Sequence, residues 1–347
     1  MGNKISFASQ ARVRRQPNTT APQALSLNGS TYNFELDRTG FLRAILLKVS
    51  GTVTLSSGGA FPTDGFAPFN VIDKIRLNTK GGGTIIFDVN GYSLKQYNDR
   101  LKNCWSVDGG GNYTPNILVY QAPVASGVNN WTLHYLIPLS QNLGSSFTTG
   151  LFALQGANTQ ATLQIQTISA TSALVSNYSS SALTAQIQLD ICDVPQNPDV
   201  MLPALQVIKT VTNRFSVTQT GENLIEIPAE GILQDVQMVS VFNGTRSDAL
   251  DYIKFRTNYN NYFETQLASD NAFWYEYNYG KPKPKGVWAL DFQSDLDMPT
   301  VGSGRDAFLV QRIAKTELVP VITSGTTISG TSYFDVTTRH LINLASN

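Results

Sequence analysis

The chain has 347 residues, of which 41% are hydrophobic and 14% are charged; Lys+Arg and Asp+Glu each number 25, so the formal net charge is zero. This length predicts about two domains, and the charged share lies well below the roughly 25% of average proteins. A neutral chain argues against wrapping a nucleic acid, because that function needs a basic surface. A weakly charged surface suits burial against neighbouring subunits, although Ser/Thr/Asn-rich β-proteins also carry few charges.

The start of the chain predicts no targeting or membrane segment. Residues 1–7 lack the apolar core and small-residue cleavage site of a secretory signal peptide. No run of about 18 apolar residues occurs, so we expect no transmembrane helix. We therefore expect a protein that is not secreted by that route.

Residues 1–30 predict a basic N-terminal arm. The stretch 16–24 is rich in Pro, Thr and Ala without apolar periodicity, which indicates a flexible linker. The arm contains no acidic residue and four basic ones, namely Lys4, Arg12, Arg14 and Arg15. These cations could contact anionic lipid headgroups, genome phosphates or a neighbouring subunit, and a solvated tail is an equally good interpretation.

From Thr31 onward the sequence predicts β-strands. Apolar and polar residues alternate, which is typical of strands with one buried face, in 32–36, 131–137, 161–166 and 185–191. One helix is predicted over 92–102, because Leu94, Tyr97 and Leu101 form a single apolar stripe.

A proline-rich segment predicts the domain boundary. Three prolines fall within 193–203, and proline cannot continue a strand ladder. We predict a first domain over 31–194, a linker over 195–204 and a second domain over 205–347.

The second half of the chain repeats the first at low identity. Four segments match in the same order: 34–42 with 225–233, 72–79 with 250–257, 94–98 with 274–278, and 131–135 with 288–292. A period of about 170 residues is too long for a solenoid repeat. The matches predict two copies of one domain, although any two β-sandwiches share some likeness.

Each copy has about eight short strands with long excursions, which is typical of a jelly roll. The fold class predicted is all-β: two tandem eight-stranded jelly rolls with long loops and an N-terminal arm. The longest loops of the first copy, 103–130, 140–151 and 169–183, are predicted to form protrusions at one end of the barrel.

A basic arm, two tandem jelly rolls, a proline-rich joint and long loops together resemble the double-jelly-roll major capsid proteins of tailless, membrane-containing bacteriophages of the tectivirus type. The resemblance rests on architecture and covers nearly the whole chain. It implies a homotrimer of six barrels that forms a pseudo-hexagonal block and tiles an icosahedral shell over an internal membrane. It also implies vertex or cement proteins as partners, assembly in the host cytoplasm, and terminal arms that reach neighbours or the membrane.

The residues that commonly carry catalysis or bind metals are sparse, and we predict no cofactor and no metal. Two distant cysteines, Cys104 and Cys192, are expected to be free thiols. They cannot form a four-ligand zinc site without histidines, and the only histidines are His134 and His340. Solvated loop acids are the favoured interpretation of three aspartates whose spacing matches no EF-hand: Asp291, Asp295 and Asp297.

Two features of the second copy indicate surfaces that could contact a neighbouring subunit. The basic loop 281–285 is expected to be solvated or to contact a neighbour. Aromatic residues crowd 252–279, and we favour a core and a subunit interface over the stacking of sugars or bases.

These features predict a structural capsid subunit and not an enzyme. The alternative is a carbohydrate-binding or adhesive β-sandwich spike protein, and a two-copy jelly-roll hydrolase comes third.

Overall fold

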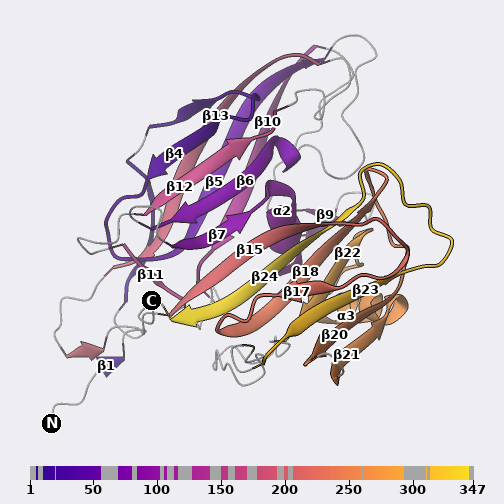
Figure 1. Cartoon of the computed structure of the whole chain (residues 1–347). Coiled ribbons are helices and arrows are strands. Elements are labelled where there is room, and N and C mark those ends of the chain that lie inside the picture. Colours follow the sequence, from indigo (N-terminus) through magenta and orange to yellow (C-terminus); the bar gives the residue numbers. More distant parts are fainter. Residues whose placement is uncertain are drawn as a thin grey trace. The chain divides into compact units, whose positions relative to one another are not determined.

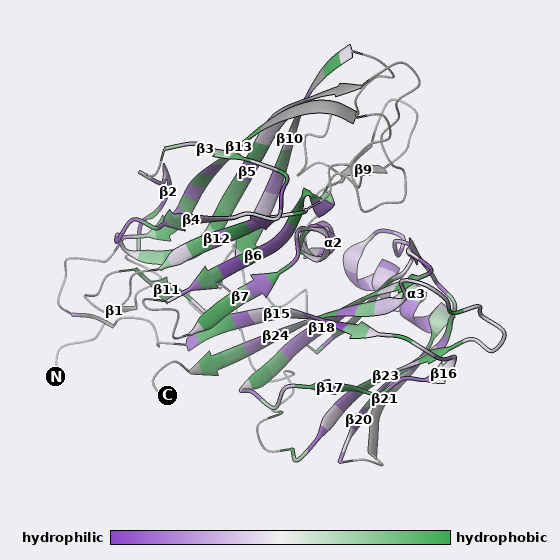
Figure 2. Cartoon of the chain, turned by 45° about the horizontal axis from the view of Figure 1, so that its top comes forward, coloured by the Kyte–Doolittle hydropathy of each residue, from purple (hydrophilic) through white to green (hydrophobic). Residues whose placement is uncertain are grey.

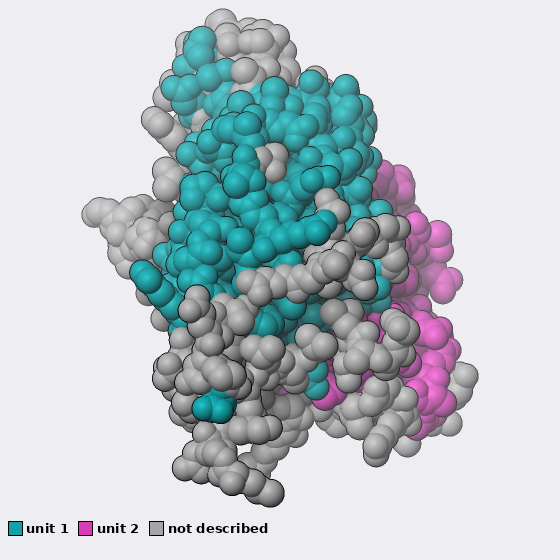
Figure 3. Space-filling view, turned by 90° about the vertical axis from the view of Figure 1, so that its left-hand side faces the viewer, with its two compact units in different colours: residues 1–209, 344–347 teal, residues 210–343 magenta. Residues whose placement is uncertain are grey.

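The computed structural model describes residues 5–6, 11–19, 21–55, 69–79, 84–101, 105–107, 113–115, 127–140, 150–154, 161–169, 178–193, 199–201, 206–258, 261–292, 310 and 313–343. The chain divides into two compact units (Figures 1 and 3). Unit 1 comprises residues 1–209 with 344–347, and unit 2 comprises residues 210–343.

Unit 1 is built from two antiparallel sheets, ordered β10-β5-β13-β2 and β4-β12-β6-β7 (Figure 1). The first contains β2 (Val13–Pro17), β5 (Phe41–Leu55), β10 (Gly127–Pro138) and β13 (Tyr178–Cys192). The second contains β4 (Thr31–Glu35), β6 (Ile72–Asn78), β7 (Ile85–Val89) and β12 (Thr162–Thr167). The short strands β3 (Gln23–Leu25) and β11 (Phe152–Ala153) pair with β13 and β5.

Unit 2 has two sheets, ordered β15-β24-β18-β22 and β17-β23-β20-β21. The first contains β15 (Gln206–Ser216), which begins just before the unit, β18 (Ile232–Phe242), β22 (Val287–Asp291) and β24 (Tyr333–Asn343). The second contains β17 (Ile225–Ile227), β20 (Leu250–Thr257), β21 (Asn261–Leu267) and β23 (Thr316–Ile322). The short strands β16 (Gly221–Glu222) and β19 (Thr245–Arg246) pair with β23 and β18.

The remaining described elements are short. They are the parallel pair β1 (Ile5–Ser6) and β14 (Val200–Met201), the antiparallel pair β8 (Trp105–Val107) and β9 (Tyr113–Pro115), and the 3-10 helix η1 (Phe69–Val71).

The same strand order occurs in both units. If the eight main strands of each unit are numbered along the chain, one sheet runs 1-8-3-6 and the other runs 2-7-4-5, in unit 1 and again in unit 2. This pairing of the first strand with the last is the jelly-roll arrangement. The predicted fold class, two tandem eight-stranded jelly rolls, is confirmed. The predicted repeat is confirmed too, because all four matched segments lie on equivalent strands or helices.

A matched pair of glycines marks the equivalence at atomic detail. Gly40 precedes β5 with φ of 66°, and Gly231 precedes β18 with φ of 52°. A Cβ atom would lie 2.3 Å from the carbonyl oxygen of Cys192 at Gly40, and 2.2 Å from that of Leu341 at Gly231. Each glycine therefore permits both a left-handed turn and a close approach of the third strand to the eighth.

Alternating burial forms the core of each unit. On β12 the side chains of Leu163 and Ile165 are fully buried while the alternating Gln164 and Gln166 are partly exposed, and Figure 2 shows such striping on several strands. In unit 2 one apolar cluster joins both sheets through residues that include Met238, Phe255, Trp288, Leu318 and Phe334. Buried aromatic and branched side chains of this kind provide the main favourable free energy of folding.

Each unit has one described helix at the same place, between its fifth and sixth strands: α2 (Gly91–Leu101) and α3 (Ala268–Tyr279). The prediction of a helix over 92–102 is confirmed. The second helix was not predicted as a helix, although its residues were matched to the first. Gly280 ends α3 in the left-handed conformation, with φ of 65° and its N–H donated to the Glu276 carbonyl at 2.8 Å.

The N-terminal segment differs from its prediction. Residues 13–17 form β2 and residues 23–25 form β3, and both pair with β13 instead of remaining a flexible arm and linker. The physical reason is that β13 offers a full ladder of backbone partners, which this segment can use despite its low apolar content.

Several predicted features lie outside the described residues. They are Lys4, Cys104, Asp295 and Asp297, most of the predicted linker 195–204, and most of the loops 103–130, 140–151 and 169–183. Within the described part, no helix is long and apolar enough to cross a membrane.

Candidate interaction surfaces

The most exposed aromatic residues of the described chain lie on α3. Phe273 is 61% exposed, Trp274 is 47% exposed and Tyr277 is 72% exposed. The rings contact one another, with centroids 5.4 Å apart for Phe273 and Trp274 and 5.7 Å apart for Trp274 and Tyr277. We call these three residues the aromatic face. Large apolar groups left in water in this way mark interaction sites.

The opposite side of α3 fixes the helix to unit 2. Tyr275, Tyr279 and Asn271 recur every four residues and are buried. The hydroxyl of Tyr279 donates to the Asp291 carboxylate at 2.9 Å, and the Asn271 amide donates to the Ala289 carbonyl at 2.9 Å. The aromatic face is therefore presented on a rigid helix.

The charges that α3 itself carries have one sign. Asp270 and Glu276 are exposed on α3, and no Lys or Arg occurs between Leu267 and Gly280. This helix consequently favours a basic partner and opposes anionic surfaces.

The equivalent helix α2 is buried on nearly every side. Its aromatic residues Tyr92 and Tyr97 are 4% and 2% exposed, and even Arg100 is 1% exposed. The Asn98 side chain bonds both backbone groups of Leu136 on β10, at 2.8 and 2.9 Å. The equivalent helix is therefore buried in unit 1, whereas its outer side is exposed in unit 2.

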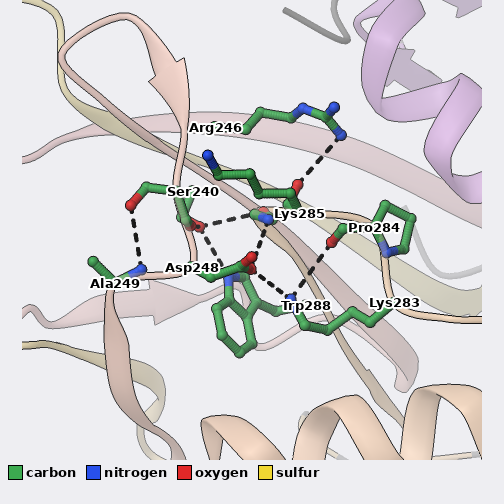
Figure 4. Close-up of polar contacts among 10 residues, drawn as sticks. Ser240, Arg246, Asp248, Ala249, Lys283, Pro284, Lys285 and Trp288 are labelled. Atoms are coloured by element: carbon green, nitrogen blue, oxygen red, sulfur yellow. Dashed lines mark hydrogen bonds and ion pairs between the residues drawn. The ribbon is translucent and has the colours of Figure 1, made fainter.

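A cluster in unit 2 corrects the prediction for the basic loop 281–285 (Figure 4). Lys283 donates to the Asp248 carboxylate at 2.7 Å and lies 3.9 Å from the centre of the Trp288 ring. Its side chain is only 8% exposed, and burial lowers the pKa of its ammonium group although Asp248 opposes the shift. The expected solvated loop is wrong for Lys281, which is 3% exposed, and for Lys283, because its ammonium group is held between the Asp248 carboxylate and the Trp288 ring.

Two further hydrogen bonds, one from a backbone N–H and one to a hydroxyl group, complete the same cluster. The Gly286 N–H donates to Asp248 at 2.8 Å, and the Trp288 indole donates to the Ser240 hydroxyl at 2.8 Å. We call this arrangement of Lys283, Asp248 and Trp288 the lysine clasp. It holds the connection between α3 and β22 in place.

The structure brings together three of the four predicted arm residues. Arg12, Arg14 and Arg15 lie on or beside β2, the last strand in the order of its sheet, and Lys4 lies outside the described residues. Arg14 is half-buried and pairs with Asp193 at 2.7 Å. Arg12 and Arg15 are exposed, and we call these two the basic edge.

The residues with catalytic potential are held in structural positions. Burial raises the pKa of the Cys192 thiol to about 11, so it is not a thiolate at neutral pH. Burial, then Lys48, lowers the pKa of His134. The His340 ring lies 2.8 Å from the Glu230 carbonyl oxygen. Among the described residues, no group of His, Cys, Asp and Glu could hold a metal.

No protein-family model and no curated protein matches the sequence. Solved structures do match along nearly the whole chain. The structure described as the STIV MCP (Sulfolobus turreted icosahedral virus) is 13% identical with a TM-score of 0.69, covering 96% of this chain and 97% of that one. The chain has the fold of these viral capsid proteins.

Two further structures extend the likeness. A capsid model of the virus PBCV-1 has a TM-score of 0.63 at 13% identity, covering 95% of this chain and 93% of that one. The major capsid protein P2 of bacteriophage PM2 has a TM-score of 0.57 at 11% identity, covering 96% of this chain and 99% of that one. The predicted resemblance to the double-jelly-roll fold is thus confirmed, including a bacteriophage example.

Proposed function

We propose that this chain is the major capsid protein of an icosahedral virus and acts by self-assembly, not by catalysis. The observation that carries the proposal is the jelly-roll strand order found twice in one chain, with end-to-end coverage of the STIV MCP. The low charge and zero net charge support it, because subunits that pack densely tolerate a weakly charged surface.

The assembly unit is a homotrimer. Two barrels in each chain give six barrels in three chains, which supports a pseudo-hexagonal block that can tile a shell. Light scattering of the purified protein tests this, and we expect a mass about three times 37.9 kDa with hexagonal blocks in negative stain. A monomer at every concentration would overturn the trimer.

Other virion components are proposed from the sequence resemblance. They are an internal membrane beneath the shell, vertex or cement proteins, and assembly in the host cytoplasm. Lipid extraction and protein mass spectrometry of purified particles test the first two. Particles that contain this chain but no lipid would contradict the membrane.

The basic edge is proposed to contact a neighbouring copy. Arg15 lies in β2 and Arg12 directly precedes it, and β2 is paired with β13, so both belong to a folded sheet and not to a free arm. The pairing holds the backbone of both residues at the sheet edge, and this favours a neighbouring subunit as the partner.

A carbohydrate-binding spike is the second candidate, favoured by the exposed Trp274 and Tyr277. A glycan array distinguishes it: specific glycan binding by a monomeric protein would support the spike over the capsid subunit.

A further inference from the structure

The aromatic face of α3 is the surface whose exposure the fold of one chain leaves unexplained. Its three rings contact one another yet remain about half exposed or more. Aromatic residues of this kind form the energetic centres of protein interfaces. A binding partner is needed to remove them from water.

The internal repeat shows that this helix position can be fully enclosed. Its counterpart α2 places Tyr92, Leu94 and Tyr97 at 4% exposure or less. In α3, the equivalent helix, the outer side is open while the inner side packs on β20, β21 and β22. A second protein surface over α3 would give it the enclosure that α2 already has.

The charges on α3 indicate which kind of partner fits the aromatic face. Asp270 and Glu276 flank the aromatic face without any Lys or Arg on the helix, which opposes anionic lipid and nucleic acid. The basic edge on unit 1 has the opposite sign: Arg12 and Arg15 are exposed, whereas the neighbouring Asp190 is largely buried beside Arg43 and Asp193 pairs with Arg14. The chain therefore carries a complementary pair of surfaces.

Two contacts within the chain already combine a cation, an aromatic ring and a carboxylate. The Arg214 guanidinium lies 3.8 Å from the centre of the Tyr333 ring and bonds both oxygens of Asp335 at 2.8 Å. The lysine clasp repeats the theme with Lys283, Trp288 and Asp248. A cation held between an aromatic ring and a carboxylate is stabilised by both.

From these observations we infer that the aromatic face of α3 docks onto the basic edge of a second copy of this chain. Residues 12 and 15 point to opposite faces of the extended segment, so the two arginines reach α3 from either side of the sheet edge, toward Trp274 and Tyr277 and toward Asp270 and Glu276. The contact joins two different surfaces, so it is heterologous and can close a ring such as the proposed trimer. The inference rests on the proposed function and names the contact that builds its trimer.

Sedimentation of the full-length protein over a range of concentrations tests the inference. The variant W274S/Y277S is expected to weaken association at least about tenfold. The control L224S changes another exposed apolar residue of unit 2, which is 56% exposed, and is expected to associate like wild type. Circular dichroism and the thermal midpoint of the monomer verify that each variant is folded.

A charge exchange tests the pairing itself. R12E/R15E and D270R/E276R are each expected to weaken association, and the combined variant is expected to restore at least part of it. If the wild-type protein is a trimer and all these variants are trimers too, the inference is overturned but the proposed function is not. Failure of the combined variant to restore association overturns the basic edge as the partner.

Oxidative footprinting of the wild-type protein needs no substitution. Trp274 and Tyr277 should be protected in the oligomer and become reactive on dilution. Equal reactivity in both states overturns the inference, whereas a wild-type protein that never associates overturns the proposed trimer as well.

Discussion

The helices α2 and α3 occupy the same place in two copies of one fold and differ in what surrounds them. Tyr97 of α2 is 2% exposed, whereas Tyr277 of α3 is 72% exposed. The strand order around both helices is the same. The comparison teaches that a duplicated domain keeps its strand pairing while the outer side of an equivalent helix is free to acquire a different task.

The largest loss of folding stability is expected from substitutions at the matched glycines of the two units. Gly40→Ala and Gly231→Ala should each destabilise the protein by about 3 kcal/mol or more, because the new Cβ meets a backbone oxygen in a left-handed turn. Gly244→Ala is the control: its φ is 77° but no atom lies within 4 Å of the added Cβ. It should cost about 1–2 kcal/mol.

Urea unfolding followed by circular dichroism measures these costs. Equal and small losses for Gly40→Ala and Gly244→Ala would contradict the close approach of β5 to β13.

The helices themselves give the next test. Tyr97→Ala should lower the free energy of unfolding by about 3 kcal/mol, since a buried ring is lost from a packed site. Tyr277→Ala should change the folding stability of the monomer by less than about 0.5 kcal/mol, because its ring is exposed. Thermal unfolding at a concentration where the protein is monomeric measures both. Similar losses for the two variants would remove the contrast between α2 and α3.

The lysine clasp offers a smaller effect. Lys283→Met keeps an apolar stem over Trp288 and removes the charge, so it should destabilise unit 2 by about 1 kcal/mol. Lys285→Met alters an exposed side chain of the same loop and should change stability by less than about 0.5 kcal/mol. Denaturant midpoints compare the two, and equal midpoints would show that the clasp is not stabilising.

Acid should affect the units differently. Burial raises the pKa of Glu317, but bonds from Arg256 and Lys315 outweigh it and leave the pKa below the usual 4.5. A lowered carboxyl pKa stabilises the folded state above 4.5, and this is lost as the pH falls through the folded value. Burial raises the pKa of Asp190 in unit 1, although Arg43 and Arg15 oppose the shift, so its effect has the opposite sign.

Hydrogen exchange at decreasing pH measures this difference. Peptides from β23 should lose protection before those from β13, and Glu317→Gln should flatten the acid dependence in unit 2. If both units lost protection at the same pH and Glu317→Gln did not change this, the stabilising role given to the Glu317 carboxylate would be contradicted.

Much of the fold was predictable because it depends on local periodicity. The alternation in 161–166 and 185–191 identified β12 and β13, and four segments that match in the same order identified the repeat. The α3 helix was harder to predict, because aromatic residues fill both of its sides and leave no single apolar stripe.

The candidate surface was only partly predictable. Composition placed the aromatic residues in 252–279, yet which of them are exposed depends on packing against β22. The pairing of β2 with β13 joins residues far apart in the sequence, and no local pattern in 13–17 signals it. The burial of Lys283 likewise depends on Asp248, which lies on a distant segment.

An electron cryo-microscopy reconstruction of the purified oligomer tests the central claim most directly. A capsid subunit of this fold predicts three copies arranged as a ring of six barrels, with α3 of each copy covered by the basic edge of the next. A particle of one chain, with both barrels isolated and the aromatic face of α3 open to solvent at every concentration, would contradict it.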